Sequence, residues 1–255
     1  MAGGPFRLSE EEGPGAIVNG WIFLGDAHLN PYRKDFTWDA FRRLVADPPE
    51  GLVLMGDFFD FWFGFSDNTH LESLYGDIRE AFERLGEGGT RIIFLEGNHD
   101  FCLSGEIFGI RVENHRWEVS LQLDGLRLYL SHGDRASGFP HNLPCILLKN
   151  RILCSLLSLL GPKVITPLAF LWAARSRRCP ADGRLKERLR SFALQKLREG
   201  VDVVIMAHTH DPEAVQWELQ GRKGLYFNVG SFREGDYLLF SGGRFTLKKF
   251  KDGLP

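Results

Sequence analysis

Five short motifs rich in aspartate and histidine occur in order along the chain. They are Gly25-Asp26-Ala27-His28, Gly56-Asp57-Phe58-Phe59-Asp60, Gly97-Asn98-His99-Asp100, Ser131-His132-Gly133-Asp134 and Ala207-His208-Thr209-His210. Their side chains offer carboxylate, imidazole and amide donors but no thiolate. Such donors suit Mn, Fe, Zn or Mg ions and do not suit a structural zinc–thiolate site. The motifs therefore predict a metal centre with oxygen and nitrogen ligands.

The number of donors indicates two ions rather than one. The candidate metal ligands are Asp26, His28, Asp57, Asn98, His132, His208 and His210. One tetrahedral ion needs only four ligands, and with Asp57 bridging, these residues divide into two sets of four. Two divalent cations roughly 3.5–4 Å apart would clamp a phosphoryl group and lower the pKa of a water between them. The chemistry that we expect is therefore in-line attack on phosphorus.

Each motif alone also has an ordinary structural explanation. An isolated histidine is usually packed or on the surface, Asn98 suits a turn, and Asp26 suits a helix N-cap. The joint pattern favours a functional site, because five of the eight histidines fall in these motifs. Every motif also lies at or just after the end of a short apolar run.

These apolar runs predict buried strands at residues 21–24, 52–55, 92–95, 126–130 and 203–206. The carboxyl ends of neighbouring strands in an α/β sheet converge on one crevice, so the loops that follow them bring distant residues together. Helical spacing of apolar residues predicts helices over 36–46, 71–85 and 184–198. Further strands are expected over 214–219, 224–229, 237–240 and 245–250. This order predicts an α/β layered domain with a mixed sheet or two packed sheets.

The segment 139–181 differs from the rest of the chain. It has no Asp or Glu and is rich in large apolar residues, and its basic residues are Lys149, Arg151, Lys163, Arg175, Arg177 and Arg178. A membrane-spanning helix is excluded by length, because Gly161-Pro162 and Lys163 interrupt it and the longer arm spans only roughly 16 Å of a ~30 Å hydrocarbon core. Two interpretations of the resulting helix pair remain open. It is either an ordinary core hairpin or a cationic, apolar surface for an anionic amphiphile or a membrane face.

Composition narrows the class of protein. The chain has 255 residues, of which 44% are hydrophobic and 25% charged, so it is neither disordered nor fibrous. A net charge of -2 gives no support to a protein that coats nucleic acid. Cys102, Cys145, Cys154 and Cys179 contain no CxxC spacing, which favours reduced thiols in a cytoplasmic protein. Residues 1–15 lack the features of a signal peptide, so we do not expect export.

Taken together, the D-x-H, GDxxD, GNHD, HGD and HxH motifs resemble those of the calcineurin-like metallophosphoesterase superfamily, over about residues 21–240. The resemblance implies a single domain over 1–255, folded as a four-layer αββα sandwich of two mixed β-sheets. It implies that one ion is held by Asp26, His28, Asp57 and His210, and the other by Asp57, Asn98, His132 and His208. One departure is Ala207, where the superfamily usually has Gly.

The same resemblance implies catalytic roles for residues that are not ligands. His99 would lie beside the attacked phosphate and act as a general acid or transition-state stabiliser. Asp60 or Asp100 would orient its ring.

Three further features are similar to the UDP-2,3-diacylglucosamine hydrolases of lipid A biosynthesis. They are the aromatic run 58–65, the Asp211-Pro212 pair after His210, and the segment 228–232. Together with the acid-free insert, they imply a helical lid at about 139–181 that holds acyl chains. The implied reaction is hydrolysis of the substrate's diphosphate to a lipid monosaccharide 1-phosphate and UMP, with two divalent ions that are typically Mn²⁺.

The expected substrate is an anionic sugar-nucleotide lipid, and no nucleic acid partner is expected. Substrate contacts are predicted from the lid residues Arg175, Ser176, Arg177 and Arg178. The guanidinium groups of the three arginines suit phosphate oxygens, and the resemblance implies that the Arg175–Ser176 pair lies near the sugar phosphate. The protein would be cytoplasmic, with a possible peripheral place on the cytoplasmic face of the inner membrane.

Two other functions remain open from the sequence. One is a phosphodiesterase or phosphatase of the same superfamily that acts on nucleotides or another phospholipid-like substrate. His99 bears on this alternative, because the best-known diacylglucosamine hydrolases have Arg there. The other is a non-catalytic metal-binding scaffold, which predicts lost ligands, whereas all seven candidate ligands are present.

Overall fold

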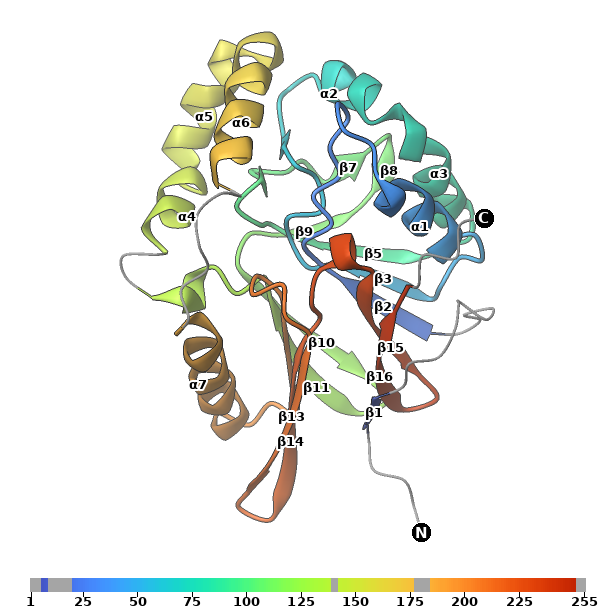
Figure 1. Cartoon of the computed structure of the whole chain (residues 1–255), viewed down its shortest axis with the longest axis vertical. Coiled ribbons are helices and arrows are strands. Elements are labelled where there is room, and N and C mark those ends of the chain that lie inside the picture. Colours follow the sequence, from blue (N-terminus) through green and yellow to red (C-terminus); the bar gives the residue numbers. More distant parts are fainter. Residues whose placement is uncertain (1–5, 9–19, 139–141, 177–183, 251–255) are drawn as a thin grey trace.

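The computed structural model describes residues 6–8, 20–138, 142–176 and 184–250 (Figure 1). The larger of its sheets has seven strands, in the order β1-β16-β15-β2-β3-β5-β9. In that order the strands are Phe6–Leu8, Arg244–Lys249, Asp236–Ser241, Gly20–Leu24, Gly51–Leu54, Arg91–Leu95 and Glu113–His115. Strands β2, β3, β5 and β9 are parallel, and β15 joins β2 antiparallel. The sheet is therefore mixed.

The second sheet has five strands, in the order β10-β11-β12-β14-β13. Its strands are Glu118–Leu123, Leu126–Ser131, Val203–Met206, Arg222–Asn228 and Glu213–Leu219. The three inner strands are parallel and the two outer ones are antiparallel to their neighbours. Four shorter strands form two small sheets: β4 (Trp62–Phe63) with β6 (Asp100–Phe101), and β7 (Glu106–Ile107) with β8 (Ile110–Arg111).

Helices cover the outer face of each sheet. The helices α1 (Phe36–Leu44), α2 (Thr69–Leu74) and α3 (Arg79–Glu87) lie on the side of the seven-stranded sheet, and α7 (Leu185–Arg198) lies on the five-stranded sheet (Figure 1). The layers follow the order helix, sheet, sheet, helix, which confirms the predicted αββα sandwich.

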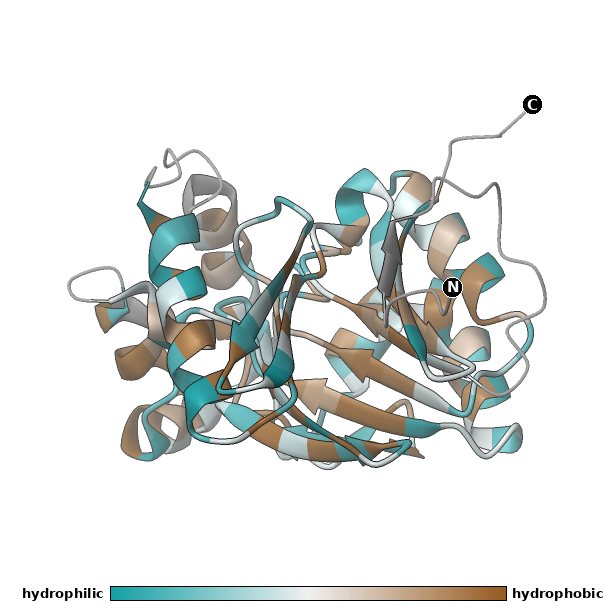
Figure 2. Ribbon diagram, turned by 90° about the horizontal axis from the view of Figure 1, so that it is seen from below, coloured by the Kyte–Doolittle hydropathy of each residue, from teal (hydrophilic) through white to brown (hydrophobic). Residues whose placement is uncertain are grey.

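Alternation along the strands explains these layers, because successive side chains of a strand point to opposite faces. In β2, Ile22 packs in the cluster with α1 and α3, whereas Phe23 packs in the core between the sheets. In β12, Ile205 faces that same central core, and Val204 packs against α7. Figure 2 shows the resulting hydrophobic colouring along the strands. Each inner strand is thus apolar on both faces, as the continuous apolar runs predicted.

The helix predicted over 71–85 is not continuous. The structure has α2, a 3₁₀ turn at Gly76–Ile78, and then α3 starting at Arg79. Gly76 is a poor helix former. The preceding Tyr75 is fully buried and its hydroxyl donates to the backbone oxygen of Phe61 at 3.0 Å. Burial of this tyrosine and the weak propensity at the glycine together account for the break.

The described part of the acid-free segment forms three helices, which we call the lid: α4 (Leu143–Leu148), α5 (Arg151–Leu160) and α6 (Pro162–Ser176). The two predicted arms are present as α5 and α6, whereas α4 was not predicted. Asn150 caps α5, since its side-chain oxygen accepts from the backbone N–H of Ile152 at 2.9 Å. Gly161 separates α5 from α6 with a φ of 76°.

Within the described residues, no single helix is long and apolar enough to cross a bilayer. The segments Arg151–Leu160 and Pro162–Ala173 meet the criteria only as a pair, and the pair is bent by 117°.

Lys149 anchors the lid to the core and does not belong to a cationic surface. Its side chain is buried, and its Nζ donates to Asp134 Oδ2 at 2.6 Å and to the backbone oxygen of Glu96 at 2.7 Å. Burial alone would raise the pKa of Asp134, but the Lys149 charge outweighs it and the pKa is lowered. The ion pair therefore joins α4 to the HGD motif.

The prediction that all cysteines are reduced is wrong for one pair. Cys102 and Cys154 form a disulfide across 52 residues of sequence, and Cys145 is free and buried. Cys179 lies outside the described residues. The spacing of cysteines in the sequence does not predict this pair, because the two residues meet only when the lid folds onto the core.

The Lys149 anchor makes a prediction about stability. We expect Lys149→Met to lower the free energy of unfolding by about 3–5 kcal/mol, because it leaves a buried carboxylate without its partner. Lys163→Met, which removes an exposed lysine of the same lid, should change it by less than about 0.5 kcal/mol. Urea unfolding followed by circular dichroism measures both values.

The effect of Lys149→Met should also depend on pH. The lowered pKa of Asp134 stabilises the fold above the ordinary carboxyl pKa, and this stabilisation is lost as the pH falls through the folded value. The difference between wild type and variant should therefore shrink in acid. Equal unfolding midpoints for Lys149→Met and Lys163→Met at neutral pH would contradict the anchor.

Candidate metal centre

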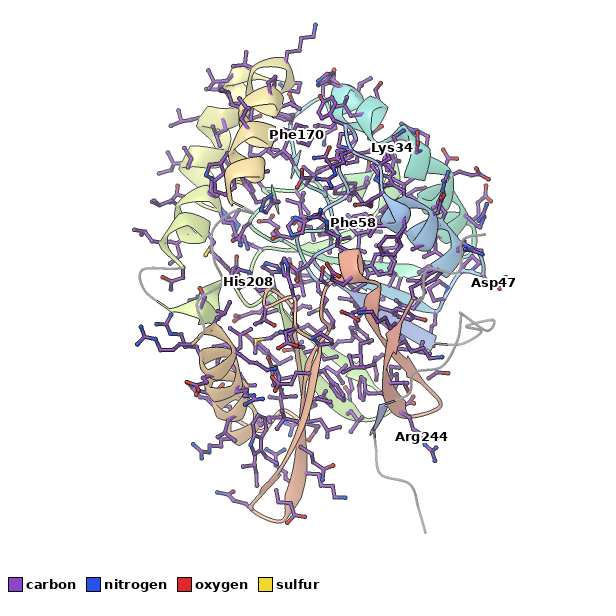
Figure 3. The ribbon with its side chains drawn as sticks, viewed as in Figure 1. Lys34, Asp47, Phe58, Phe170, His208 and Arg244 are labelled. Carbon is purple, nitrogen blue, oxygen red and sulfur yellow. A yellow bond between two sulfur atoms is a disulfide. The ribbon has the colours of Figure 1, made fainter. Side chains whose placement is uncertain are left out.

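The five motifs meet where the carboxyl ends of strands from both sheets approach one another. Strands β2, β3 and β5 lead into the first three motifs, and β11 and β12 lead into the last two. In Figure 3, His208 and Phe58 lie near the middle of the molecule, in this region. The expected convergence of the motifs on one crevice therefore takes place between the two sheets.

The structure brings together the residues predicted to hold the first ion. His210 Nε2 lies 3.2 Å from Asp26 Oδ1, and His28 Nε2 lies 3.9 Å from Asp57 Oδ2. Asp26, His28 and His210 each present one donor atom within 4.8 Å of the other two. This spacing is compatible with a shared cation.

The residues predicted for the second ion gather on the other side of Asp57. His132 Nε2 lies 3.7 Å from Asp57 Oδ2, and His208 Nδ1 lies 3.1 Å from His132 Nε2. The backbone N–H of Asn98 donates to Asp57 Oδ1 at 2.6 Å, so Asn98 adjoins the same carboxylate. Asp57 thus lies between the two sets of candidate ligands.

Five of the seven candidate ligands have a left-handed backbone. The φ angles of Asp26, His28, Asp57, His208 and His210 range from 47° to 73°. Residues other than glycine rarely adopt this conformation, and such strain concentrates at functional sites. Hydrogen bonds between loops hold it here: the backbone N–H of Asp26 donates to Gly56 at 3.0 Å, and that of His28 donates to Asp57 at 2.9 Å.

Two glycines are required by close approach at this site. A Cβ atom at Gly97 would lie 2.1 Å from Asp57 Oδ1, so only glycine leaves room for this carboxylate. A Cβ atom at Gly25 would lie 2.8 Å from the Cβ of Ala207. The methyl group that departs from the superfamily pattern at Ala207 is therefore accommodated because residue 25 has no side chain.

The electrostatics divide the histidines into two groups. Burial lowers the pKa of His28 to about 3 and that of His208 to about 4, so both rings are neutral. The charge of Asp26 raises the pKa of His210 to about 9. Burial opposes protonation of His132, but the charges of Asp57 and Asp26 outweigh it and its pKa is raised. His210 therefore carries a proton at neutral pH that a cation would displace.

The central carboxylate is ionised despite its burial. Burial works to raise the pKa of Asp57, but its electrostatic interactions with His99 and His132 and the backbone hydrogen bond from His99 hold it well below its usual range. The backbone N–H groups of Asn98 and His99 also donate to Asp57 Oδ1, at 2.6 and 2.9 Å.

Divalent metal ions fit this group of residues. The donors are carboxylate oxygens and imidazole nitrogens, which such ions accept. His28 Nδ1 is buried without a hydrogen-bond partner among the described residues, although buried polar atoms normally have one. This nitrogen lies 3.8 Å from Asp60 Oδ1, in the cluster of His28, Asp60 and His99, so these donors are compatible with a cation.

His99, predicted to be catalytic, lies beside the candidate ligands. Its Nδ1 lies 3.1 Å from the backbone oxygen of Asp60, and its ring centroid lies 4.8 Å from that of His28 and 5.7 Å from that of Trp172. The contact that orients His99 is thus made by the backbone of Asp60. The Asp60 carboxylate accepts from Asn30 Nδ2 at 2.5 Å, a contact that no sequence motif indicated.

Asp100 ties two of the loops together. Its Oδ1 accepts from the backbone N–H groups of Asp57 and Gly97 at 2.8 and 2.9 Å, and its Oδ2 accepts from those of Phe58 and Phe59 at 2.6 and 3.1 Å. Burial raises the pKa of Asp100 to about 8, and the charge of Asp57 adds to the rise, while the backbone donors act against it. The Asp100 carboxylate therefore positions the loop that carries Asp57.

An apolar cavity of about 240 Å³ opens beside His99, between the lid and the core. Asp60, Phe61, His99 and Phe101 line it from the core, and Leu148, Leu157, Ile165, Leu168, Ala169 and Trp172 line it from the lid. The predicted apolar cleft over 156–160 and 168–172 is thus present in part, because Leu159 and Leu171 point outward and are exposed.

The predicted substrate contacts lie at the end of the lid. Arg175 and Ser176 occupy the last turn of α6. Arg177 and Arg178 lie outside the described residues. Their contact with a substrate stays a prediction.

Comparison with known proteins gives a consistent group of relatives. Residues 22–212 match the family model for calcineurin-like phosphoesterase. A UDP-2,3-diacylglucosamine hydrolase from Aeromonas hydrophila is 36% identical over 117 residues, which cover 44% of this chain and 47% of that protein, about half of its length. Longer alignments, each covering 89% of this chain, are made with proteins of the same name. The protein from Aeromonas salmonicida is 29% identical, and the alignment covers 92% of its length. The protein from Stenotrophomonas maltophilia is 26% identical, and the alignment covers 96% of its length.

The protonated ring of His210 makes a prediction about metal binding. Binding of Mn²⁺ to the metal-free protein at pH 7.5 should release about one proton or more, because a ligand imidazole must be neutral. The pKa of about 9 makes His210 a source of this proton. Isothermal titration calorimetry in buffers of different ionisation enthalpy measures the release.

The matched variants are His210→Ala and His70→Ala, since His70 lies on α2, outside the five motifs. The first should release fewer protons and the second as many as the wild type. The release should also fade as the pH rises past 9. Unchanged release in His210→Ala would show that His210 is not a ligand.

Proposed function

Because the chain belongs to the calcineurin-like phosphoesterase family, we propose that it is a metal-dependent hydrolase of the diphosphate in UDP-2,3-diacylglucosamine. The products would be UMP and a lipid monosaccharide 1-phosphate. Two relatives that align over 89% of this chain have this substrate in their names. The observation that carries the proposal is the apolar cavity beside His99, which adjoins the candidate metal ligands.

The proposed ligands of two divalent ions, most simply Mn²⁺, are Asp26, His28, Asp57, Asn98, His132, His208 and His210. When bound, the ions would offset negative charge on the phosphate oxygens and lower the pKa of a water. The protein's part is to hold Asp57 ionised between the two ligand sets. The N–H groups of Asn98 and His99 stabilise that charge.

His99 is the proposed general acid or transition-state stabiliser. With Nδ1 facing the Asp60 carbonyl at 3.1 Å, the opposite nitrogen, Nε2, is available to a phosphate. The ring is buried against Trp172 of the lid, which keeps water away from it. Proton transfer from a positioned side chain of this kind contributes typically 10²–10⁴-fold to a rate.

The cavity explains why a lipid substrate is favoured over a soluble nucleotide. Its lid wall consists of aliphatic and aromatic side chains, whereas His99 and Asp60 lie at the core side, nearest the metal ligands. An acyl chain in the cavity would gain about 0.8 kcal/mol for each buried CH₂ group. A free nucleotide has no group that uses this apolar wall.

The outer surface of the lid suggests where such a substrate is met. Among the described residues, the exposed large apolar side chains other than Tyr32 all lie on the lid: Leu143, Ile146, Leu147, Ile152, Leu156, Leu159, Leu160, Val164, Leu168, Leu171 and Trp172. Exposed apolar side chains gathered on one set of helices are typical of a membrane contact. The proposal therefore includes a peripheral place on the cytoplasmic face of the inner membrane.

The direct test of the substrate uses the purified protein with Mn²⁺. It is incubated with UDP-2,3-diacylglucosamine, with UDP-N-acetylglucosamine, and with a panel of nucleotides, and products are read by mass spectrometry. The proposal predicts UMP and the lipid 1-phosphate from the diacylated compound and far slower turnover of the others. Preferential hydrolysis of nucleotides would instead favour another phosphoesterase of the family.

Two variants separate metal binding from proton transfer. Asp57→Asn should lose metal and at least about 10³-fold in kcat, because the isosteric amide carries no charge for two ions to share. His99→Gln should lose about 10²–10⁴-fold in kcat and keep the metal content of the wild type in elemental analysis. Loss of metal from His99→Gln would make this residue a ligand and overturn its proposed role.

Membrane contact through the lid is tested by vesicle flotation. The double variant Leu159→Glu/Leu171→Glu should reduce the fraction that floats with vesicles containing anionic lipid by about tenfold or more, because it places two charges on the apolar surface. Gln122→Glu/Gln216→Glu adds the same charge at exposed positions of β10 and β13 and should float as the wild type does. Equal loss in both variants would mean that only net charge matters.

A further inference from the structure

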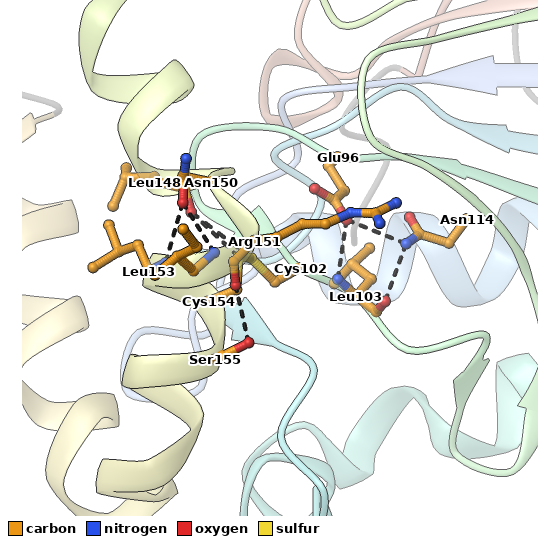
Figure 4. The surroundings of a disulfide bond; sticks show 11 residues. Glu96, Cys102, Leu103, Asn114, Leu148, Asn150, Arg151, Leu153, Cys154 and Ser155 are labelled. Carbon is orange, nitrogen blue, oxygen red and sulfur yellow. Dashed lines mark hydrogen bonds between the residues drawn. A yellow bond between two sulfur atoms is a disulfide. The ribbon is translucent and has the colours of Figure 1, made fainter.

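The disulfide joins the lid to the strand that follows the catalytic loop. Cys102 comes directly after β6 and three residues after His99, and Cys154 lies in the first turn of α5 (Figure 4). Their Cα atoms are 6.2 Å apart, within the usual range for a disulfide. The covalent link therefore spans the two sides of the apolar cavity, since Phe101 and Leu157 line it from β6 and α5.

Helix α5 has few other attachments to the core. None of its ten residues is buried, and its side chains Ile152, Leu156 and Leu159 are exposed. The neighbouring helices are held differently. Lys149 anchors the end of α4, and Phe170 of α6 packs against Tyr32 and Phe61 with ring centroids 5.1 and 6.0 Å apart. The disulfide is thus a principal constraint on α5.

The disulfide is accessible to small molecules. Both cysteines line an open cavity of about 760 Å³, together with Glu96, Leu103, Asn114, His115, Arg116, Trp117, Arg151 and Ser155. Cys102 and Cys154 are only half-buried, and both line this open cavity. An aqueous reagent in the cavity can therefore reach the disulfide.

The surroundings also favour Cys154 as the leaving group in thiol–disulfide exchange. Cys154 lies in the first turn of α5 and is preceded by Arg151, which is exposed and lines the same cavity. A helix N-terminus and a guanidinium both stabilise a thiolate, and a more stable thiolate is a better leaving group. Arg116 and Arg151 would also attract a thiol that carries carboxylate groups.

We propose that Cys102–Cys154 is a redox-sensitive clasp that holds the lid against the core and opens by exchange with a small anionic thiol. The thiolate of one molecule attacks Cys102 Sγ, and the sulfur–sulfur bond breaks with its electron pair on Cys154. A second thiol displaces Cys102 from the mixed disulfide. The balance is two thiols oxidised to one small-molecule disulfide, and one protein disulfide reduced to two protein thiols, with both protons conserved.

Reduction leaves the protein with satisfied polar groups. The backbone oxygen of Leu148 lies 3.7 Å from Cys102 Sγ and 3.6 Å from Cys154 Sγ, so either reduced thiol can donate to it. Reduction therefore removes a covalent constraint on α5 without exposing a new unpaired group. The expected consequence is a wider range of positions for the lid wall of the apolar cavity.

The clasp deepens the proposed function and rests on it in one respect. If the cavity takes an acyl chain, the oxidised and reduced forms should differ in how fast the substrate enters and the lipid product leaves. A cytoplasmic disulfide is usually transient or redox-sensing, which fits a switch better than a permanent staple. The chemistry of the clasp itself does not depend on the substrate.

Hydrogen–deuterium exchange of the whole protein tests the clasp. The wild type is compared after oxidation with diamide and after reduction with glutathione, and mass spectrometry of unreduced peptides reports the Cys102–Cys154 link. We expect amides of α5 to exchange about tenfold faster or more in the reduced protein, while those of α7 are unchanged. Absence of the link after oxidation, or equal exchange of α5 in the two states, would overturn the proposal.

Cysteine variants provide the matched controls. Cys154→Ser should show fast exchange of α5 under both conditions, whereas Cys145→Ser, which removes the buried free thiol, should respond as the wild type does. The comparison of the two wild-type states needs no variant, so a folding defect in Cys154→Ser leaves the test intact.

Turnover of UDP-2,3-diacylglucosamine, measured in parallel, separates the two proposals. A redox response in exchange without any turnover would support the clasp and contradict the substrate. Turnover of the substrate with no redox response in exchange would support the proposed substrate and contradict the clasp.

Discussion

A carboxylate enclosed by two β-sheets stays ionised only if donors and positive charge surround it, and Asp57 meets this requirement. Two backbone N–H groups donate to one of its oxygens, and the histidines on either side hold its pKa far below the usual range. The same arrangement demands that Gly97 lack a side chain, because a Cβ there would overlap Asp57 Oδ1. Asp100 holds the loop that carries Asp57 by accepting four backbone hydrogen bonds. The geometry around one carboxylate thus sets the positions of the loops that carry the candidate metal ligands.

The fold supplies these loops from two sheets, and the lid then encloses what the loops leave open. Loops from the seven-stranded sheet carry Asp26, Asp57 and Asn98, and loops from the five-stranded sheet carry His132 and His208. The left-handed backbone at five candidate ligands is maintained by hydrogen bonds between these loops. The lid adds the apolar wall beside His99, and it is held by a buried ion pair at α4 and a disulfide at α5. The candidate metal centre and the apolar cavity therefore lie side by side.

The sequence predicted what depends on local pattern and missed what depends on distant contacts. Strands such as β2 and β12 were evident from continuous apolar runs, and the motifs after them indicated a common edge of the sheet. The break at Gly76 was missed because it follows from burial of Tyr75 against Phe61. Burial of Lys149 was missed because its partner, Asp134, lies outside the acid-free segment. The disulfide could not be predicted for the same reason, since its cysteines are 52 residues apart and pair only across the lid.

The central claim is that Asp57 is shared by two metal ions at the edge where the sheets meet. Anomalous diffraction from crystals soaked in Mn²⁺ tests it most directly, because the signal locates manganese without reference to the protein density. The account predicts two anomalous peaks roughly 3.5–4 Å apart, with the Asp57 carboxylate between them and His210 and His208 on opposite sides. A single peak, or two peaks that do not share Asp57, would contradict it.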